Sequence, residues 1–269
     1  MKLLFLDLDG TLLNDEKEIN KGDMDAIDEM LSKGHKVIIN SGRPLHSIMV
    51  LAEKFGFIRP GFYLSAFNGG LIYDPVTKER LKFDTLEEET VRHMFDEAYK
   101  MGLHCHTYIS DHVVAERDTK ELKFYTERIH MPPMVVDDFT KATKGFPPKV
   151  IIISLDGKDR LEAYREALAE YTKEKNLYCT FSDIRLLEYA NPKANKGEAI
   201  RFMCEHLNVD ISDTVAAGDE ENDLPMIIAA GTGVCMKNGV DTLKKEADYI
   251  TENTNNECGI REIIYKFIL

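Results

Sequence analysis

The chain has 269 residues, with 34 Lys and Arg against 47 Asp and Glu, so its formal net charge is −13. Nucleic acids and anionic membranes select basic surfaces, so this charge argues against both as partners. A hydrophobic fraction of 43% and a charged fraction of 30% are typical of a globular protein, and the length favours about two domains.

The cysteines and the first residues favour a cytoplasmic location. The five cysteines are far apart, odd in number and form no CxxC pair, which is typical of free thiols in a reducing compartment. Asp7 and Asp9 interrupt the first apolar run, so we expect no secretory signal there. No apolar run approaches the roughly 18 residues that a membrane helix needs.

The first part of the chain alternates predicted strands and helices. Apolar runs predict strands over residues 3–8, 36–40 and 62–67, and apolar residues at helical spacing predict helices over 21–33 and 45–55. This alternation is typical of a parallel sheet with crossover helices. Ligands bind to such sheets at the carboxyl ends of the strands, where the first polar motifs stand.

The pattern changes after residue 73, where a turn at Asp74-Pro75 is followed by residues 81–83, which we expect to pair back. We expect an insert with helices near 86–101, 118–129 and 159–175, strands near 150–155 and 178–182, a hairpin across residues 110–111 and a Pro- and Gly-rich connection over 132–148. The alternation then resumes, with helices near 195–207 and 257–268 and strands over 214–217 and 232–235. The sequence therefore predicts an α/β fold: a Rossmann-like, doubly wound parallel sheet from residues 1–81 and 187–269, interrupted by an inserted α+β domain of residues 82–186.

Four polar motifs follow predicted strands or begin a helix. They are Asp7-Leu8-Asp9-Gly10-Thr11, Ser41-Gly42-Arg43, Lys196 in Ala194-Asn195-Lys196-Gly197, and Gly218-Asp219-Glu220-Glu221-Asn222-Asp223. Carboxylates two residues apart on an extended strand point the same way, so Asp7 and Asp9 can address one small object. Gly10 permits a sharp turn after them. The hydroxyl and backbone amides of the second motif suit an oxyanion.

If the sheet closes as predicted, these motifs meet. Four carboxylates within several Å would repel one another unless a cation neutralised them, and here they are Asp7, Asp9, Asp219 and Asp223. An all-oxygen site favours a hard ion, with Mg²⁺ the natural choice. Lys196 and Ser41 would offer a charge and a hydroxyl to a phosphate, and phosphoryl transfer depends mainly on positioning and charge neutralisation. One carboxylate can attack phosphorus and a second can move the proton.

In order and spacing, over essentially the whole chain, these motifs resemble those of haloacid dehalogenase (HAD) superfamily phosphatases of the Cof type, whose large cap is inserted between the second and third motifs. The resemblance implies that Asp7 is the nucleophile and Asp9 the general acid and base. It also implies that Mg²⁺ is bound by the side chains of Asp7 and Asp219 and by the backbone carbonyl of Asp9.

The resemblance assigns further residues to the phosphate. It implies that Ser41 and Lys196 bind the transferring phosphoryl group, and the residues expected to orient the phosphate or Lys196 are Gly10, Thr11, Gly42, Asn222 and Asp223. Arg43 and Asn68 are expected to line the substrate pocket, with a purely structural turn as the equal alternative for Asn68. His104 and His106 share one face of a predicted insert strand, and we interpret this face as a cap surface that faces a sheet or solvent, with substrate contact as the alternative.

We therefore expect a Mg²⁺-dependent phosphatase that hydrolyses small phosphorylated metabolites, with sugar phosphates as the family-level expectation, through an aspartyl-phosphate intermediate. Two alternatives stay open at this point. A phosphomutase or phosphotransferase would pass the same phosphoryl group to a hydroxyl instead of water. A non-catalytic sensor would bind a phosphometabolite without turnover, but Asp9 argues against it, because a pure binder needs no proton shuttle.

Overall fold

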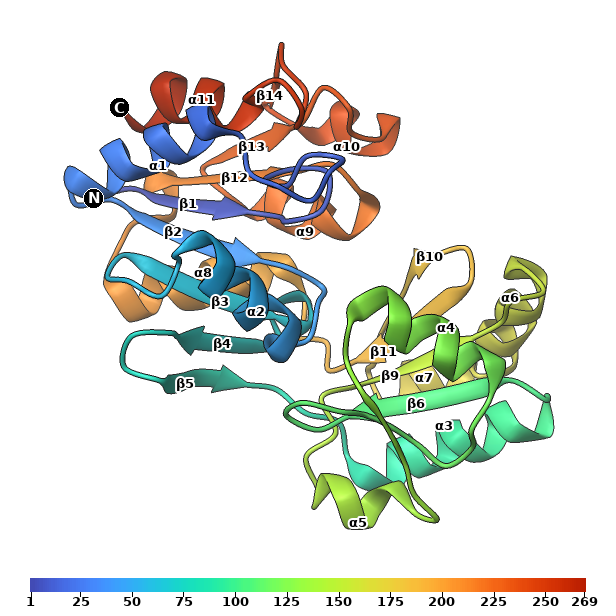
Figure 1. The fold of residues 1–269 in the computed structure, drawn as a ribbon. Coiled ribbons are helices and arrows are strands. Elements are labelled where there is room, and N and C mark those ends of the chain that lie inside the picture. The colour runs from blue at the N-terminus through green and yellow to red at the C-terminus, as the bar shows by residue number, and fades with distance from the viewer. The chain divides into compact units, whose positions relative to one another are not determined.

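The structure is a computed structural model that describes residues 1–269, and it divides into two compact units (Figure 1). The first unit comprises Met1–Gly42, Ile48–Lys82 and Asn195–Leu269. The second comprises Arg43–Ser47 and Phe83–Ala194. The second unit extends past residue 186 because Leu186–Ala190 forms a strand of its own sheet.

The first unit contains an eight-stranded sheet in which the N-terminal strand is central. Its strand order is β14 (Tyr249–Ile250), β13 (Thr232–Cys235), β12 (Thr214–Gly218), β1 (Leu3–Leu6), β2 (Lys36–Asn40), β3 (Phe62–Ala66), β4 (Leu71–Asp74) and β5 (Glu79–Phe83). All pairs from β14 to β3 are parallel, and β4 is antiparallel to β3. The predicted α/β fold with a mainly parallel sheet is therefore confirmed.

Helices cover this sheet and bury its apolar side chains. Leu3 and Phe5 of β1 share one core cluster with residues of α8 (Lys196–Leu207) and α9 (Leu224–Ala229). Neighbouring strand residues point to opposite faces, and on the other face α1 (Lys21–Ser32) packs against α11 (Gly259–Ile263) (Figure 1). The remaining helices are α2 (Leu45–Phe55), α10 (Asp241–Glu246) and the short turns η1 (Phe67–Gly69), η2 (Ile211–Asp213), η3 (Glu221–Asp223) and η4 (Ile264–Ile268).

The second unit is an α+β domain with a six-stranded sheet. The strand order is β10 (Tyr178–Asp183), β11 (Leu186–Ala190), β9 (Lys149–Ile153), β6 (His104–Tyr108), β7 (Val113–Ala115) and β8 (Pro133–Val135). Neighbours are antiparallel except β7 and β8. Its helices are α3 (Glu88–Lys100), α4 (Lys120–Ile129), α5 (Phe139–Thr143), α6 (Lys158–Ala167) and α7 (Ala169–Glu174).

Two parts of the second unit differ from the sequence prediction. The helix expected over 159–175 is divided at Leu168, which is 2% exposed and packs into the core cluster of this unit. The connection expected over 132–148 contains β8 and α5. Pro133 begins β8, an edge strand, where the missing N–H of proline removes no ladder hydrogen bond. In neither unit is a helix long and apolar enough to cross a membrane.

Candidate active site

The candidate site lies at the carboxyl ends of three adjacent strands of the first unit. The parallel register pairs Leu6 with Ala217 of β12 and with Ile39 of β2, so the next residue, Asp7, emerges between the ends of these two strands. The Asp7 N–H donates to the Ala217 carbonyl at 3.1 Å, which continues the ladder. Three buried strands therefore fix the backbone of Asp7.

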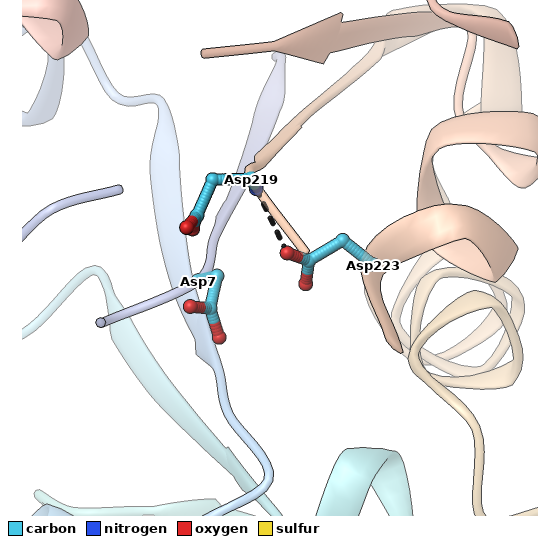
Figure 2. Close-up of side chains that lie close together, drawn as sticks. All are labelled: Asp7, Asp219 and Asp223. Atoms are coloured by element: carbon cyan, nitrogen blue, oxygen red, sulfur yellow. Dashed lines mark hydrogen bonds between the residues drawn. The ribbon is translucent and has the colours of Figure 1, made fainter. Parts of the chain in front are cut away.

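Three aspartates from two strand ends converge at this edge (Figure 2). Carboxylate oxygens of Asp7, Asp219 and Asp223 lie within 4.8 Å of one another, and all three residues are buried. Asp219 follows β12 directly, and its N–H donates to Oδ2 of Asp223 at 2.9 Å, as the dashed line in Figure 2 shows. The Glu220 N–H donates to the same oxygen at 3.1 Å, so Asp223 closes the loop after β12.

The ammonium group of Lys196 lies between two of these carboxylates. It donates to Oδ1 of Asp7 and to Oδ1 of Asp223, and its side chain is fully buried. Lys196 is the first residue of α8, whose N-cap, Asn195, accepts from two backbone N–H groups of the first turn. Burial alone would lower the pKa of Lys196, but the charges of Asp223 and Asp7 outweigh it and hold the pKa above its usual value.

The carboxylates of the cluster are more basic than free aspartates. Burial raises the pKa of Asp7 to about 7, and the charge of Asp223 acts in the same direction while Lys196 opposes it. Burial and the charge of Asp7 raise the pKa of Asp219 to about 8. Three carboxylates and one ammonium group, all ionised, sum to a charge of −2. A divalent cation would neutralise that charge and lower both pKa values.

The donor set fits a hard divalent cation. Asp223 has both oxygens occupied by N–H donors, so it positions Lys196 and the loop. Asp219 accepts from the Thr11 hydroxyl through Oδ1 at 2.7 Å, and its other carboxylate oxygen can face a cation. Asp7 also offers a second oxygen besides the one that binds Lys196. Carboxylate oxygens of this kind are the ligands that Mg²⁺ prefers.

Two glycines allow the backbone to approach these carboxylates. Gly10 has a φ of +82°, and a Cβ atom there would lie 2.2 Å from Oδ2 of Asp219. A Cβ atom at Gly218 would lie 2.4 Å from Cβ of Asp223. Any larger residue at either position would displace a carboxylate, so both glycines are required by the geometry of the cluster.

A second group of polar residues connects β2, η1 and η3. Ser41 directly follows β2 and is 2% exposed; its N–H donates to the Ser65 carbonyl and its carbonyl accepts from the Asn68 N–H. Asn68 has a φ of 56°, and its Oδ1 accepts from Asn222 at 3.4 Å. A Cβ atom at Gly42 would lie 3.0 Å from the same oxygen. Asn68 thus forms both a left-handed turn, which asparagine tolerates, and a polar link to Asn222.

The two remaining predicted residues have other surroundings. The Asp9 side chain is 39% exposed and accepts from Lys17 at 3.0 Å. Arg43 falls within the second unit by its contacts, and its guanidinium donates to the Ser47 hydroxyl at 3.2 Å.

Sequence reasoning did not single out Asn40, which links the end of β2 to the start of α8. Asn40 is fully buried at the end of β2, and its Nδ2 donates to the carbonyl of Lys196 at 3.1 Å. Its Oδ1 accepts from the Ser65 hydroxyl at 2.8 Å. The amide therefore fixes the start of α8 against the sheet. The sequence signal for this contact was one amide residue at the end of an apolar run. Such a side chain is buried if the run forms a core strand, and a buried polar side chain needs a hydrogen-bond partner.

The second unit has its own buried polar cluster. Thr119, His104 and His106 lie in one hydrogen-bonded row, with ring and hydroxyl atoms 2.9 and 3.1 Å apart, and the row continues to Tyr108 and Tyr125. Burial lowers the pKa of His104 to about 4 and lowers that of His106 as well, so both rings are neutral at pH 7. Both histidines are buried within the second unit, so they do not lie on a surface that faces solvent, as the sequence interpretation had allowed.

Comparisons with known proteins match the whole chain. A sequence model of the haloacid dehalogenase-like hydrolases matches residues 4–264. A 5-amino-6-(5-phospho-D-ribitylamino)uracil phosphatase of Bacillus subtilis is 30% identical, with 100% of this chain and 96% of that protein covered. A crystal structure of a haloacid dehalogenase-like hydrolase from Bacteroides thetaiotaomicron is similar with a TM-score of 0.88 at 29% identity, covering 98% of each chain. A crystal structure from Thermotoga maritima has a TM-score of 0.86 at 30% identity, covering 100% of this chain and 98% of that one.

Proposed function

This chain belongs to the haloacid dehalogenase-like hydrolase family, and we propose that it is a Mg²⁺-dependent phosphatase that acts through an aspartyl-phosphate intermediate. The observation that carries the proposal is the buried Lys196 ammonium held between Asp7 and Asp223, with Asp219 in the same cluster. The Lys196 ammonium group lies beside the Asp7 carboxylate, which is anchored by three strands. A phosphoryl group would therefore meet a positive charge and a nucleophile at one point.

The proposed reaction has two steps on the side chain of Asp7. A carboxylate oxygen of Asp7 attacks phosphorus, and the bond from phosphorus to the leaving oxygen breaks while Asp9 gives that oxygen its proton. Asp9 then takes a proton from water, whose oxygen attacks the aspartyl phosphate. Inorganic phosphate leaves and Asp7 is regenerated as a carboxylate. Lys196 pairs with Asp7 before the attack and with the phosphoryl oxygens afterwards.

The proposed metal site uses the residues that the cluster leaves available. Asp7 and Asp219 would hold Mg²⁺ through side-chain oxygens, together with the backbone carbonyl of Asp9. When bound, the ion supplies charge neutralisation for phosphate oxygens. Ser41, Gly42 and Asn222 would contribute the hydroxyl, backbone N–H and amide donors on the other side of the phosphate.

We propose small phosphorylated metabolites as substrates, and among them esters of sugars or sugar alcohols. The support is the Bacillus subtilis relative, whose name specifies a phosphate on a ribityl chain. The five cysteines are all free thiols, which supports the proposed cytoplasmic location. A screen of phosphorylated metabolites with Mg²⁺ present, ranked by kcat/KM, tests the substrate class; a best substrate without a sugar or sugar-alcohol group would overturn it.

The nucleophile is tested by Asp7→Asn. The variant should lose hydrolysis of 4-nitrophenyl phosphate, by at least about 10³-fold, while its far-UV circular dichroism and melting behaviour show a folded protein. Asp15→Asn, an exposed carboxylate on the loop after β1, is the matched control and should keep its activity. Substantial residual turnover by Asp7→Asn would rule out the nucleophile assignment.

Two further measurements separate the alternatives. Chelation of divalent cations should remove activity and Mg²⁺ should restore it, so activity that is indifferent to EDTA would contradict the metal assignment. Stoichiometric release of inorganic phosphate identifies a hydrolase, whereas an isomerised or transferred phosphate ester identifies a phosphotransferase. Turnover of any ester excludes a non-catalytic sensor.

A further inference from the structure

The turn after Asp9 is held by asparagine side chains from the C-terminal part of the chain. Nδ2 of Asn238 donates to the carbonyl of Gly10 at 2.8 Å, and Nδ2 of Asn255 donates to the carbonyl of Leu13 at 3.0 Å. The two asparagines are themselves joined, because the Asn255 N–H donates to Oδ1 of Asn238 at 3.1 Å. One linked pair therefore contacts both ends of the turn.

The turn itself closes tightly around Asp9. The Leu13 N–H donates to the Leu8 carbonyl at 2.8 Å, the Leu12 N–H donates to the Asp7 carbonyl at 3.3 Å, and Asp9 and Leu13 form a bridge. The Asp9 side chain is 39% exposed, so packing around the side chain contributes little to its position. Apart from its ion pair with Lys17, which is itself exposed, the position of this carboxylate is determined by the backbone that carries it.

Asn238 lies on the loop after β13, and hydrogen bonds join this loop to the backbone around Asp219. At the two ends of the loop, the Met236 N–H donates to the Gly218 carbonyl and the Val240 N–H to the Asp219 carbonyl, both at 2.9 Å. The side chain of Asn238 reaches from this loop to Gly10. It thus joins the strand end that carries Asp219 to the turn that carries Asp9.

Asn255 is the buried member of this asparagine pair. The residue is 4% exposed, and its carbonyl accepts from Nδ2 of Asn20 at 2.8 Å. Its backbone N–H, its carbonyl and its Nδ2 each have a hydrogen-bond partner, so its orientation is determined by hydrogen bonds on both sides.

We propose that Asn238 and Asn255 are positioning residues that hold Asp9 at a fixed position relative to Asp219 during proton transfer to the leaving group. The inference rests on the proposed function, in which Asp9 is the general acid. Proton transfer requires heavy atoms within hydrogen-bonding reach, and a displacement of about 1 Å can lower a rate about 100-fold. Neither asparagine contacts the acid cluster through its side chain, so the effect acts through the backbone of the turn.

The test compares two esters of similar size whose leaving groups differ in basicity. Phenyl phosphate needs a proton on its departing oxygen, whereas 4-nitrophenyl phosphate releases 4-nitrophenolate, a stable anion that needs little help from an acid. Asn238→Ala should lower kcat/KM for phenyl phosphate by about 10- to 100-fold and for 4-nitrophenyl phosphate by less than about 3-fold. The ratio kcat/KM isolates the first transfer, because it excludes steps after the aspartyl phosphate forms.

Asn256→Ala is the matched control. Asn256 is an exposed asparagine next to Asn255. It exchanges hydrogen bonds with Asp15, which lies two residues beyond Leu13 in the segment after β1. This variant should change neither ester by more than about twofold. Asn238 is exposed, so Asn238→Ala should fold normally, and Asn255→Ala is read only after its melting temperature shows a folded protein.

The outcomes are distinct. Equal losses on both esters, no loss on either, or the same selective loss in Asn256→Ala would overturn the positioning role. Asp9→Asn, measured alongside, tests the proposed function separately. If Asp9→Asn loses turnover of phenyl phosphate selectively and Asn238→Ala does not, the present inference alone fails; if Asp9→Asn keeps full activity on both esters, the acid assignment itself fails.

Discussion

Asp219→Asn should stabilise the protein when divalent cations are removed. Burial and the charge of Asp7 raise the pKa of Asp219 from 3.8 to about 8. One pKa unit corresponds to about 1.4 kcal/mol, so keeping this carboxylate ionised in the folded state disfavours folding by at most about 6 kcal/mol. The Asn amide that replaces the carboxylate also loses hydration when it is buried, so we expect a net gain of about 2–4 kcal/mol at pH 8 or above.

The sign of the pH dependence follows from proton binding. Between pH 4 and 8 the folded protein keeps a proton on Asp219 that the unfolded chain has lost, so the stability of the wild type falls as pH rises through this range. Below pH 4 both states are protonated and the difference disappears. Asn cannot ionise, so the free energies of unfolding of variant and wild type should diverge from pH 4 to 8.

Urea unfolding in EDTA at several pH values measures this divergence. Added Mg²⁺ should raise the stability of the wild type at pH 8 and have little effect on the variant, because the ion binds the folded state through the carboxylate that is missing. Glu221→Gln is the control: it removes an exposed carboxylate two residues away and should leave the pH profile unchanged. A variant less stable than wild type at pH 8 in EDTA would refute the reasoning.

Two further substitutions test the close approach of Gly10 to Asp219 and a buried ion pair in the second unit. Gly10→Ala should lower the free energy of unfolding by at least about 3 kcal/mol, because its Cβ would lie 2.2 Å from Asp219; Gly34→Ala, with a φ of +86° but no atom within 4 Å, should lose only about 1 kcal/mol in the same urea experiment, and equal losses would contradict the close approach. In the second unit, Glu188→Gln should cost about 3–5 kcal/mol, because it leaves the buried Lys149 ammonium without its carboxylate at 2.8 Å. A loss below about 1 kcal/mol in thermal unfolding would contradict that pairing.

The sequence was sufficient to predict the sheet and the meeting of its polar motifs. Strands β1, β2 and β12 are short apolar runs, each followed at once by polar residues, and parallel strands bring their carboxyl ends to one edge. Asp7 and Asp219 therefore had to lie close together once the strands were adjacent. Lys196 could be added because it begins a helix, and residues at a helix start also face that edge.

Other features depend on pairings that no local pattern specifies. Asn40, Asn238 and Asn255 are single asparagines, and only the folded chain shows which carbonyls they reach. The segment Leu186–Ala190 would fit either sheet, and it joins β9 of the second unit through a register that the sequence does not encode locally. The hairpin expected across residues 110–111 is confirmed as the antiparallel pair β6 and β7, whereas the pairing of β9 with β6 and β11 is again not specified by any local pattern.

The central position of β1 implies an order of events during synthesis. Residues Leu3–Leu6 leave the ribosome before the other strands of their sheet, yet one of their two neighbours is β12, which is translated after the whole second unit. One edge of β1 therefore waits unpaired while almost the whole second unit, Phe83–Ala194, is produced as one continuous segment. That segment can complete its own core before the strand that carries Asp7 gains its last partner, so the proposed nucleophile reaches its final position late in synthesis.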